Sequence, residues 1–96
     1  MSRAASKRCV VAYAESARQY LWPVELPAEA TVAEAIAEAR RQAQGSEMHI
    51  PWDTAPVGIF GEPRSRTDVP ADGDRIELYR PLRDDPRARR RARARR

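Results

Sequence analysis

The stretch that decides the fold is PAEATVAEAIAEARRQAQG, residues 27–45. Thr31 and, three residues later, Glu34 form a capping box, in which each side chain can accept a hydrogen bond from the other residue's backbone N–H. Apolar residues then recur at helical spacing along one stripe: Val32, Ile36, Ala39 and Ala43. This pattern predicts one amphipathic helix over about residues 32–44.

Two apolar stretches precede this helix. RCVVAYA, residues 8–14, is apolar on both faces of an extended chain, which is typical of a central strand. YLWPVEL, residues 20–26, contains Pro23, which cannot donate a ladder hydrogen bond and therefore belongs at a sheet edge. Because the link between the two stretches is short and polar, they are predicted to form an antiparallel hairpin.

Two further strands are predicted after the helix. VGIF covers residues 57–60 and RIELYR covers residues 75–80, and the polar, Pro-containing segment between them is predicted to be rich in turns. The alternation in RIELYR turns Ile76 and Leu78 inward and leaves Arg75, Glu77 and Tyr79 facing outward. The order strand, strand, helix, strand, strand (ββαββ) indicates the α+β class.

Charge divides the chain into a body and a tail. Residues 83–96 contain eight Arg and two Asp, a net charge of +6, so residues 1–82 together carry −2. We expect residues 1–6 to be frayed, residues 7–82 to form one domain, and residues 83–96 to be an arginine-rich tail that is disordered or marginally helical. The basicity therefore does not belong to the folded body.

No catalytic, metal or cofactor site is predicted. The one cysteine, Cys9, falls within a predicted strand, where a buried structural thiol is favoured over a nucleophile. The one histidine, His49, cannot build a metal site alone and is interpreted as a half-packed loop residue. Gly58, Gly61 and Gly73 lack the spacing of a phosphate-binding loop. With no signal peptide or long apolar run in the sequence, we expect a cytoplasmic protein.

Three stretches, taken in order, resemble the RnfH family. They are VVAYAESARQYLWPVELPAEATVAEAI from Val10, VGIFGEP from Val57, and DGDRIELYRPLRDDPRARRRARA from Asp72. The run from Asp72 to Leu82 is the most specific of them, and the resemblance covers roughly residues 9–93. It implies a ubiquitin-like β-grasp fold, with one helix packed on a mixed sheet of four to five strands.

The resemblance does not imply a known activity. It places the chain near the sulfur-carrier proteins, but those need a C-terminal Gly-Gly, and this sequence ends Ala94-Arg95-Arg96, so we expect no sulfur transfer or conjugation. Some members of the family are associated with a membrane electron-transport complex and others with a START-fold, toxin-like partner. Both associations concern gene position rather than chemistry.

The candidate binding residues fall into two groups. On the sheet, Tyr79, Arg75 and Val10 are expected to share the face turned away from the helix, where Tyr79 is either an ordinary exposed tyrosine or part of an interface. Trp22 either anchors a partner or completes the core, whereas Trp52 is assigned to the core. The second group lies in the tail: Arg87, Arg89, Arg90 and Arg91.

Two functions follow from these groups. The first is a non-catalytic protein-interaction module, an adaptor whose sheet face docks a protein while the tail steers the encounter. The alternative is a nucleic-acid or ribosome-associated accessory protein that binds through the Arg-rich tail. The tail has no aromatic residues for base stacking, so sequence-specific RNA recognition is not expected.

Overall fold

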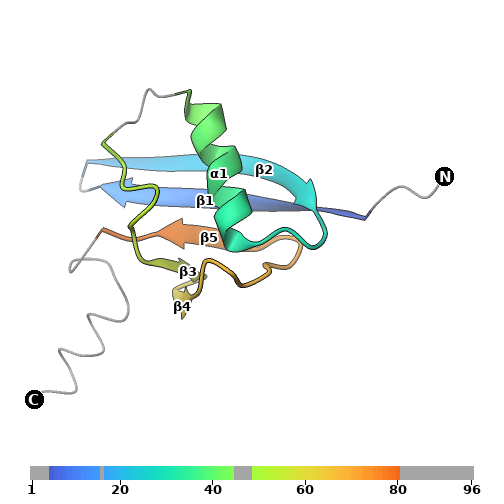
Figure 1. Cartoon of the computed structure of the whole chain (residues 1–96). Helices are drawn as coiled ribbons and strands as arrows, with labels where there is room; N and C mark the ends of the chain where they lie inside the picture. Colours follow the sequence, from blue (N-terminus) through green and yellow to red (C-terminus); the bar gives the residue numbers. More distant parts are fainter. Residues whose placement is uncertain (1–4, 16, 45–48, 81–96) are drawn as a thin grey trace, which may run out of the picture.

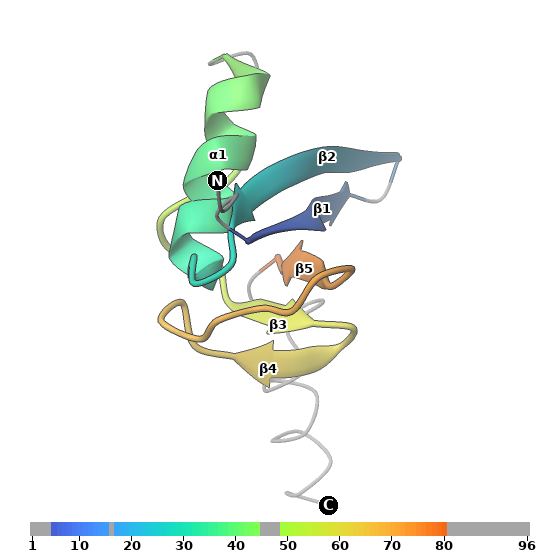
Figure 2. The ribbon, with the colours of Figure 1, turned by 90° about the vertical axis from the view of Figure 1, so that its right-hand side faces the viewer.

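The computed structural model describes residues 5–15, 17–44 and 49–80. Its elements, in chain order, are β1 (Ser6–Glu15), β2 (Arg18–Pro27), α1 (Val32–Ala43), β3 (Val57–Ile59), β4 (Glu62–Arg64) and β5 (Arg75–Leu78). One helix therefore packs on one five-stranded sheet, as Figures 1 and 2 show. The predicted α+β, β-grasp fold is confirmed.

The sheet has the order β2-β1-β5-β3-β4. β1 is an interior strand, antiparallel to β2 and parallel to β5, so the sheet is mixed. The hairpin and the edge position of β2, which carries Pro23, were both predicted from the sequence. The segment 61–74, predicted to be rich in turns, also contains the fifth strand, because Glu62–Arg64 pairs with β3.

The helix begins where its first backbone N–H groups find acceptors. Thr31 and Glu34 form the predicted capping box. The N–H of Val32 donates to the carbonyl of Asp68 at 2.8 Å, and that of Ala33 to the carbonyl of Arg66 at 2.9 Å. Since the loop before β5 satisfies these donors, the helix N-terminus is closed to an external anion.

The core lies between α1 and the sheet. The predicted helical stripe is buried, as are Val11, Ile76 and Leu78 from the two central strands. The segment after the helix closes this side, since Ile50, Trp52 and Ala55 are buried in the same cluster. Within the described part of the chain, no helix has the length and apolar character needed to span a bilayer.

Candidate functional site

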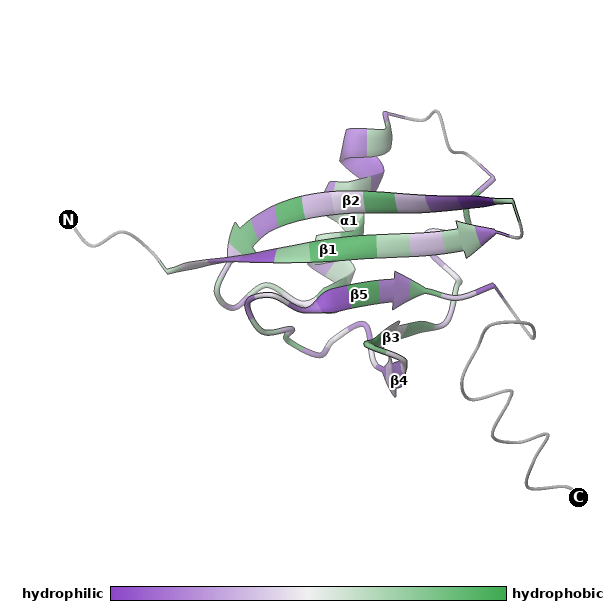
Figure 3. Ribbon diagram, turned by 180° about the vertical axis from the view of Figure 1, so that it is seen from behind, coloured by the Kyte–Doolittle hydropathy of each residue, from purple (hydrophilic) through white to green (hydrophobic). Residues whose placement is uncertain are grey.

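The face of the sheet turned away from α1 is called the outer face, and strand register determines its residues. Figure 3 views it directly, with the helix behind the sheet. Residues paired across neighbouring strands point to the same face. Ala12 on β1 therefore shares the outer face with its partners Leu21 on β2 and Glu77 on β5. One step along the strands, Val10 lies between Pro23 and Arg75.

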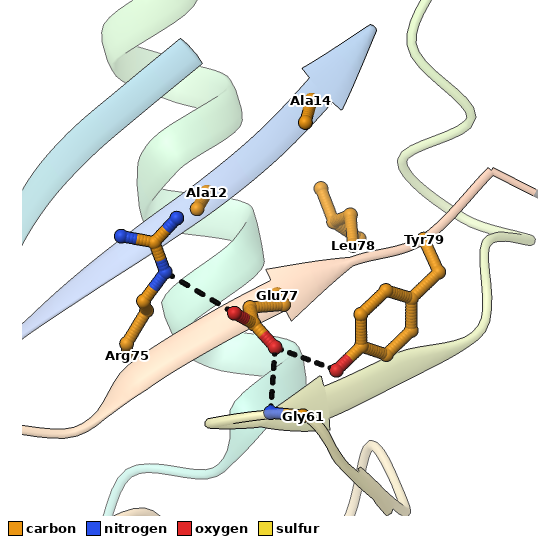
Figure 4. Close-up of a pocket in the computed structure, with 7 residues that line it drawn as sticks. All are labelled: Ala12, Ala14, Gly61, Arg75, Glu77, Leu78 and Tyr79. Carbon is orange, nitrogen blue, oxygen red and sulfur yellow. Dashed lines mark hydrogen bonds and ion pairs between the residues drawn. The ribbon is translucent and has the colours of Figure 1, made fainter. Parts of the chain in front are cut away.

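Glu77 organises the centre of the outer face. Its Oε1 accepts hydrogen bonds from the backbone N–H of Gly61 at 2.8 Å and from the Tyr79 hydroxyl at 2.6 Å. Its Oε2 accepts a bond from Nε of Arg75 at 3.2 Å. One carboxylate thus joins the β3–β4 turn to β5 and holds a guanidinium in place (Figure 4).

A shallow pocket of about 270 Å³ lies beside this network. Ala12 and Ala14 on β1 and Tyr79, which directly follows β5, supply its apolar side chains. Arg75, Glu77 and Gly61 complete the lining together with Leu78, whose side chain is buried in the core (Figure 4). The pocket combines an apolar floor with one cationic group. Such a site can bind a ligand.

Tyr79 lies on the outer side, as predicted, but it is not an exposed tyrosine. Only 8% of its surface is exposed. Its ring lies over Gly58, where an added Cβ would come within 2.4 Å of the Tyr79 hydroxyl oxygen and 2.5 Å of the Glu62 carbonyl oxygen. Gly58 therefore makes room for Tyr79, and Tyr79 forms a wall of the pocket rather than a protruding contact.

Substituting Gly58→Ala should destabilise the protein and displace Tyr79. A methyl group at this position collides with backbone as well as with the ring, so we expect a loss of about 1–3 kcal/mol in the free energy of unfolding. Urea denaturation monitors the loss. Gly73→Ala serves as a comparison, because its strain arises from a positive φ of 87° and not from a collision. An unchanged unfolding midpoint for Gly58→Ala would show that the Tyr79 ring does not lie as close to Gly58 as described.

The two-residue turn between β3 and β4 projects an aromatic side chain. Phe60 and Gly61 both have positive φ, 49° and 84°, which identifies the tight turn type that matches the twist of a hairpin. Phe60 is 63% exposed, and its N–H donates to the carbonyl of Arg75 at 3.2 Å. Sequence reasoning missed Phe60 as a site residue. The sequence signal for this turn was the pair Phe60-Gly61 between two short segments that are able to pair as strands.

Trp22 is separated from the other predicted sheet residues. It lies on the helix side of β2, where its ring stacks on Tyr20 with centroids 5.7 Å apart and contacts Trp52 at 5.0 Å. Trp52 is buried in the core, as predicted. The structure thus brings Tyr79, Arg75 and Val10 together on the outer face and places Trp22 on the opposite one. The predicted tail residues Arg87, Arg89, Arg90 and Arg91 lie outside the described residues.

Cys9 and His49 make local contacts away from the pocket. The Cys9 thiol is buried and donates to the carbonyl of Ala71 at 3.4 Å. His49 is half-exposed, with Nε2 2.7 Å from Oε2 of Glu15. Within the described ranges, no three His, Cys, Asp or Glu side chains gather as a metal site would require.

Cys9 should resist thiol reagents in the folded protein. Burial raises the pKa of the Cys9 thiol, so less thiolate is present at a given pH than for a free cysteine. We expect an aromatic disulfide reagent at neutral pH to react with Cys9 only after urea unfolds the chain. Fast stoichiometric reaction under native conditions would show that the thiol is accessible.

Comparison with known proteins gives one consistent result. A family model described as RnfH family Ubiquitin matches residues 8–93. Protein RnfH of Salmonella newport (strain SL254) is 48% identical over 86 residues, covering 88% of this chain and 85% of that protein. The UPF0125 protein YfjF of Salmonella typhimurium gives the same values.

Among solved structures, the Caldiarchaeum subterraneum ubiquitin superposes with a TM-score of 0.54. It is 20% identical and covers 78% of this chain and 92% of the archaeal chain. At this identity the likeness shows the fold alone.

Proposed function

Since this chain belongs to the RnfH family of ubiquitin-like proteins, we propose that it is a non-catalytic protein-interaction module whose outer face docks a protein partner. One observation carries the proposal: the outer face presents apolar side chains around a pocket, and no element of the described chain covers it. Leu21 is 52% exposed and Phe60 63% exposed. Exposed apolar groups beside a pocket are typical of an interface.

The chemistry of the site supports the non-catalytic part of this proposal. The carboxylate of Glu77 accepts three hydrogen bonds from the protein itself, so its oxygens are used to hold the outer face together. The cysteine thiol lies in the core rather than in the pocket. The proposal keeps the cytoplasmic location expected from the sequence.

The tail adds an electrostatic term in this proposal. Residues 83–96 carry a net charge of +6, which attracts an acidic partner over about one Debye length and raises the association rate more than the final affinity. The outer face then supplies the specific contacts.

Truncation separates the contribution of the face from that of the tail. The full chain and a chain ending at Leu82 are compared as immobilised baits, and both retain every described residue. The prey proteins are taken from the gene-position associations of the family: a subunit of a membrane electron-transport complex and a START-fold, toxin-like protein. We expect the shorter chain to retain its partner with slower association and weaker salt dependence.

A second function is favoured by the charge of residues 83–96. Eight arginines are enough for salt-dependent binding to nucleic acid, as in a ribosome-associated accessory protein. This alternative predicts that truncation at Leu82 abolishes all binding together with its steep salt dependence. That outcome would replace the adaptor proposal.

A further inference from the structure

We propose that Arg75 and the adjacent pocket bind a short acidic segment of the partner protein in which an apolar side chain neighbours a carboxylate. This inference rests on the proposed function and specifies the chemistry of the docked segment. It follows from the way the described residues use, or leave unused, their hydrogen-bonding groups on the outer face.

Glu77 positions Arg75 and is itself occupied. Its Oε1 accepts from Gly61 and Tyr79, and its Oε2 accepts from Nε of Arg75. A carboxylate with these three donors gains little from a further cation in a ligand. The acidic group of the pocket therefore serves the protein's own structure.

Arg75, in contrast, has N–H donors that no described residue uses. Nε is its one nitrogen bonded to a described residue, and the side chain is 36% exposed. Figure 4 shows its two terminal nitrogens on the β1 side of the pocket, beside Ala12. A guanidinium held at Nε presents its terminal N–H groups as a preoriented pair, which matches the two oxygens of a carboxylate.

The apolar floor of the pocket favours a ligand that carries an apolar group next to the carboxylate bound by Arg75. The side chains of Ala12, Ala14 and Tyr79 line a space of about 270 Å³ that can accept an aliphatic side chain. Removing such a side chain from water stabilises a complex. A phosphodiester backbone would satisfy Arg75 but would leave this floor uncovered, so the lining favours a peptide over a nucleic acid.

Charge outside the pocket favours the same partner. The strand that contributes Arg75 and Glu77 leads, through Tyr79 and Arg80, toward the +6 segment 83–96. The positive charge of this segment attracts an acidic segment of the partner. Arg75 then pairs with the carboxylate that neighbours the apolar side chain.

The test is a residue-resolved NMR titration of the full-length, ¹⁵N-labelled chain. The probe is the peptide acetyl-Glu-Asp-Leu-Asp-Glu-amide. Two control peptides replace its Leu by Ala, or all of its acidic residues by their amides. We expect the probe to shift the backbone signals of Ala12, Gly61 and Leu78. We expect each control peptide to bind several-fold more weakly at these signals.

Two variants assign the contact to Arg75. Arg75→Gln should weaken the binding of the probe peptide about tenfold or more, because a charge-assisted pair of hydrogen bonds is lost. Arg41→Gln removes the same charge from an exposed helix position and should change the affinity little. A dispersed spectrum of each variant shows that the fold is retained.

The inference is overturned if the Leu and Ala peptides shift the pocket signals equally, if Arg75→Gln binds like the unmodified chain, or if the pocket signals do not move. Pocket shifts with an oligouridine probe instead would assign the site to nucleic acid. If the peptide fails while substitutions on the outer face still abolish capture of a protein partner, this inference falls and the proposed function stands.

Discussion

Replacing Lys7 by Met should lower the free energy of unfolding by about 3 kcal/mol. Lys7 is the one lysine of the chain and is only 4% exposed. Its Nζ donates three hydrogen bonds, to the carbonyls of Ala28 and Ala30 at 2.8 Å each and of Pro70 at 2.7 Å. Methionine fills a similar volume but leaves these carbonyls without their donor, and the relief of desolvating a charge offsets only part of that loss.

Urea denaturation of Lys7→Met checks this expectation, with Arg8→Met as the matched control. Arg8 is the next residue along β1, but it is exposed, so its replacement should stay within about 0.5 kcal/mol. A loss of about 3 kcal/mol would be a large part of the stability of so small a domain. Equal midpoints for the two variants would mean that the ammonium does not stabilise the connection between β1 and the two loops.

Replacing Phe60 by Asn should make the protein more stable and, at the same time, a poorer binder. Phe60 holds a left-handed φ of 49°, which costs a bulky residue roughly 1 kcal/mol, whereas Asn tolerates this region and suits the Asn-Gly form of the turn. Phe60 is also 63% exposed, so its removal costs little burial. We therefore expect a gain of about 1 kcal/mol in the free energy of unfolding.

The same substitution should weaken partner binding by roughly 30-fold, the effect of losing an aromatic hot spot. Val69→Asn is the control, because Val69 is also exposed, at 57%, but belongs to the loop before β5 rather than to the turn beside the pocket. Opposite signs of the stability and binding effects would assign Phe60 to the interface. A loss of stability with unchanged affinity would assign it to the fold.

The helix and the hairpin could be predicted because their signals are local. Thr31 and Glu34 satisfy each other's backbone three residues apart, and the prediction was confirmed. Pro23 excluded a central position for β2, which is an edge strand. Alternation also assigned Ile76 and Leu78 to the core, where both are buried.

The remaining features depend on contacts between residues distant in the sequence. Pro63 and the nearby Gly61 are residue types typical of loops, but Glu62–Arg64 pairs with β3 and forms β4. The acceptors of Lys7 lie 21, 23 and 63 residues away, so no local pattern reveals them. Tyr79 was assigned to the correct face, but its burial depends on the absence of a side chain at Gly58.

The candidate site was predicted only in part, because some of its features also depend on contacts between residues distant in the sequence. Strand alternation placed Arg75 and Val10 on the outer face, and their pairing on neighbouring strands confirms that they lie together. The face of Trp22 was not decided by its residue type, since a tryptophan suits both a core and an interface. The two-residue turn that exposes Phe60 follows from the register of β3 and β4, which the sequence did not reveal.

The most direct test of docking on the outer face compares Leu21→Glu with Val69→Glu. The two native side chains are aliphatic and similarly exposed, at 52% and 57%, so neither change should unfold the protein. Leu21 lies on the outer face beside Ala12, whereas Val69 lies in the loop before β5. With the same protein partner and salt concentration, we expect Leu21→Glu to lose binding by tenfold or more and Val69→Glu to retain it. Equal affinities for the two variants, or a loss confined to Val69→Glu, would show that the partner does not dock on the outer face.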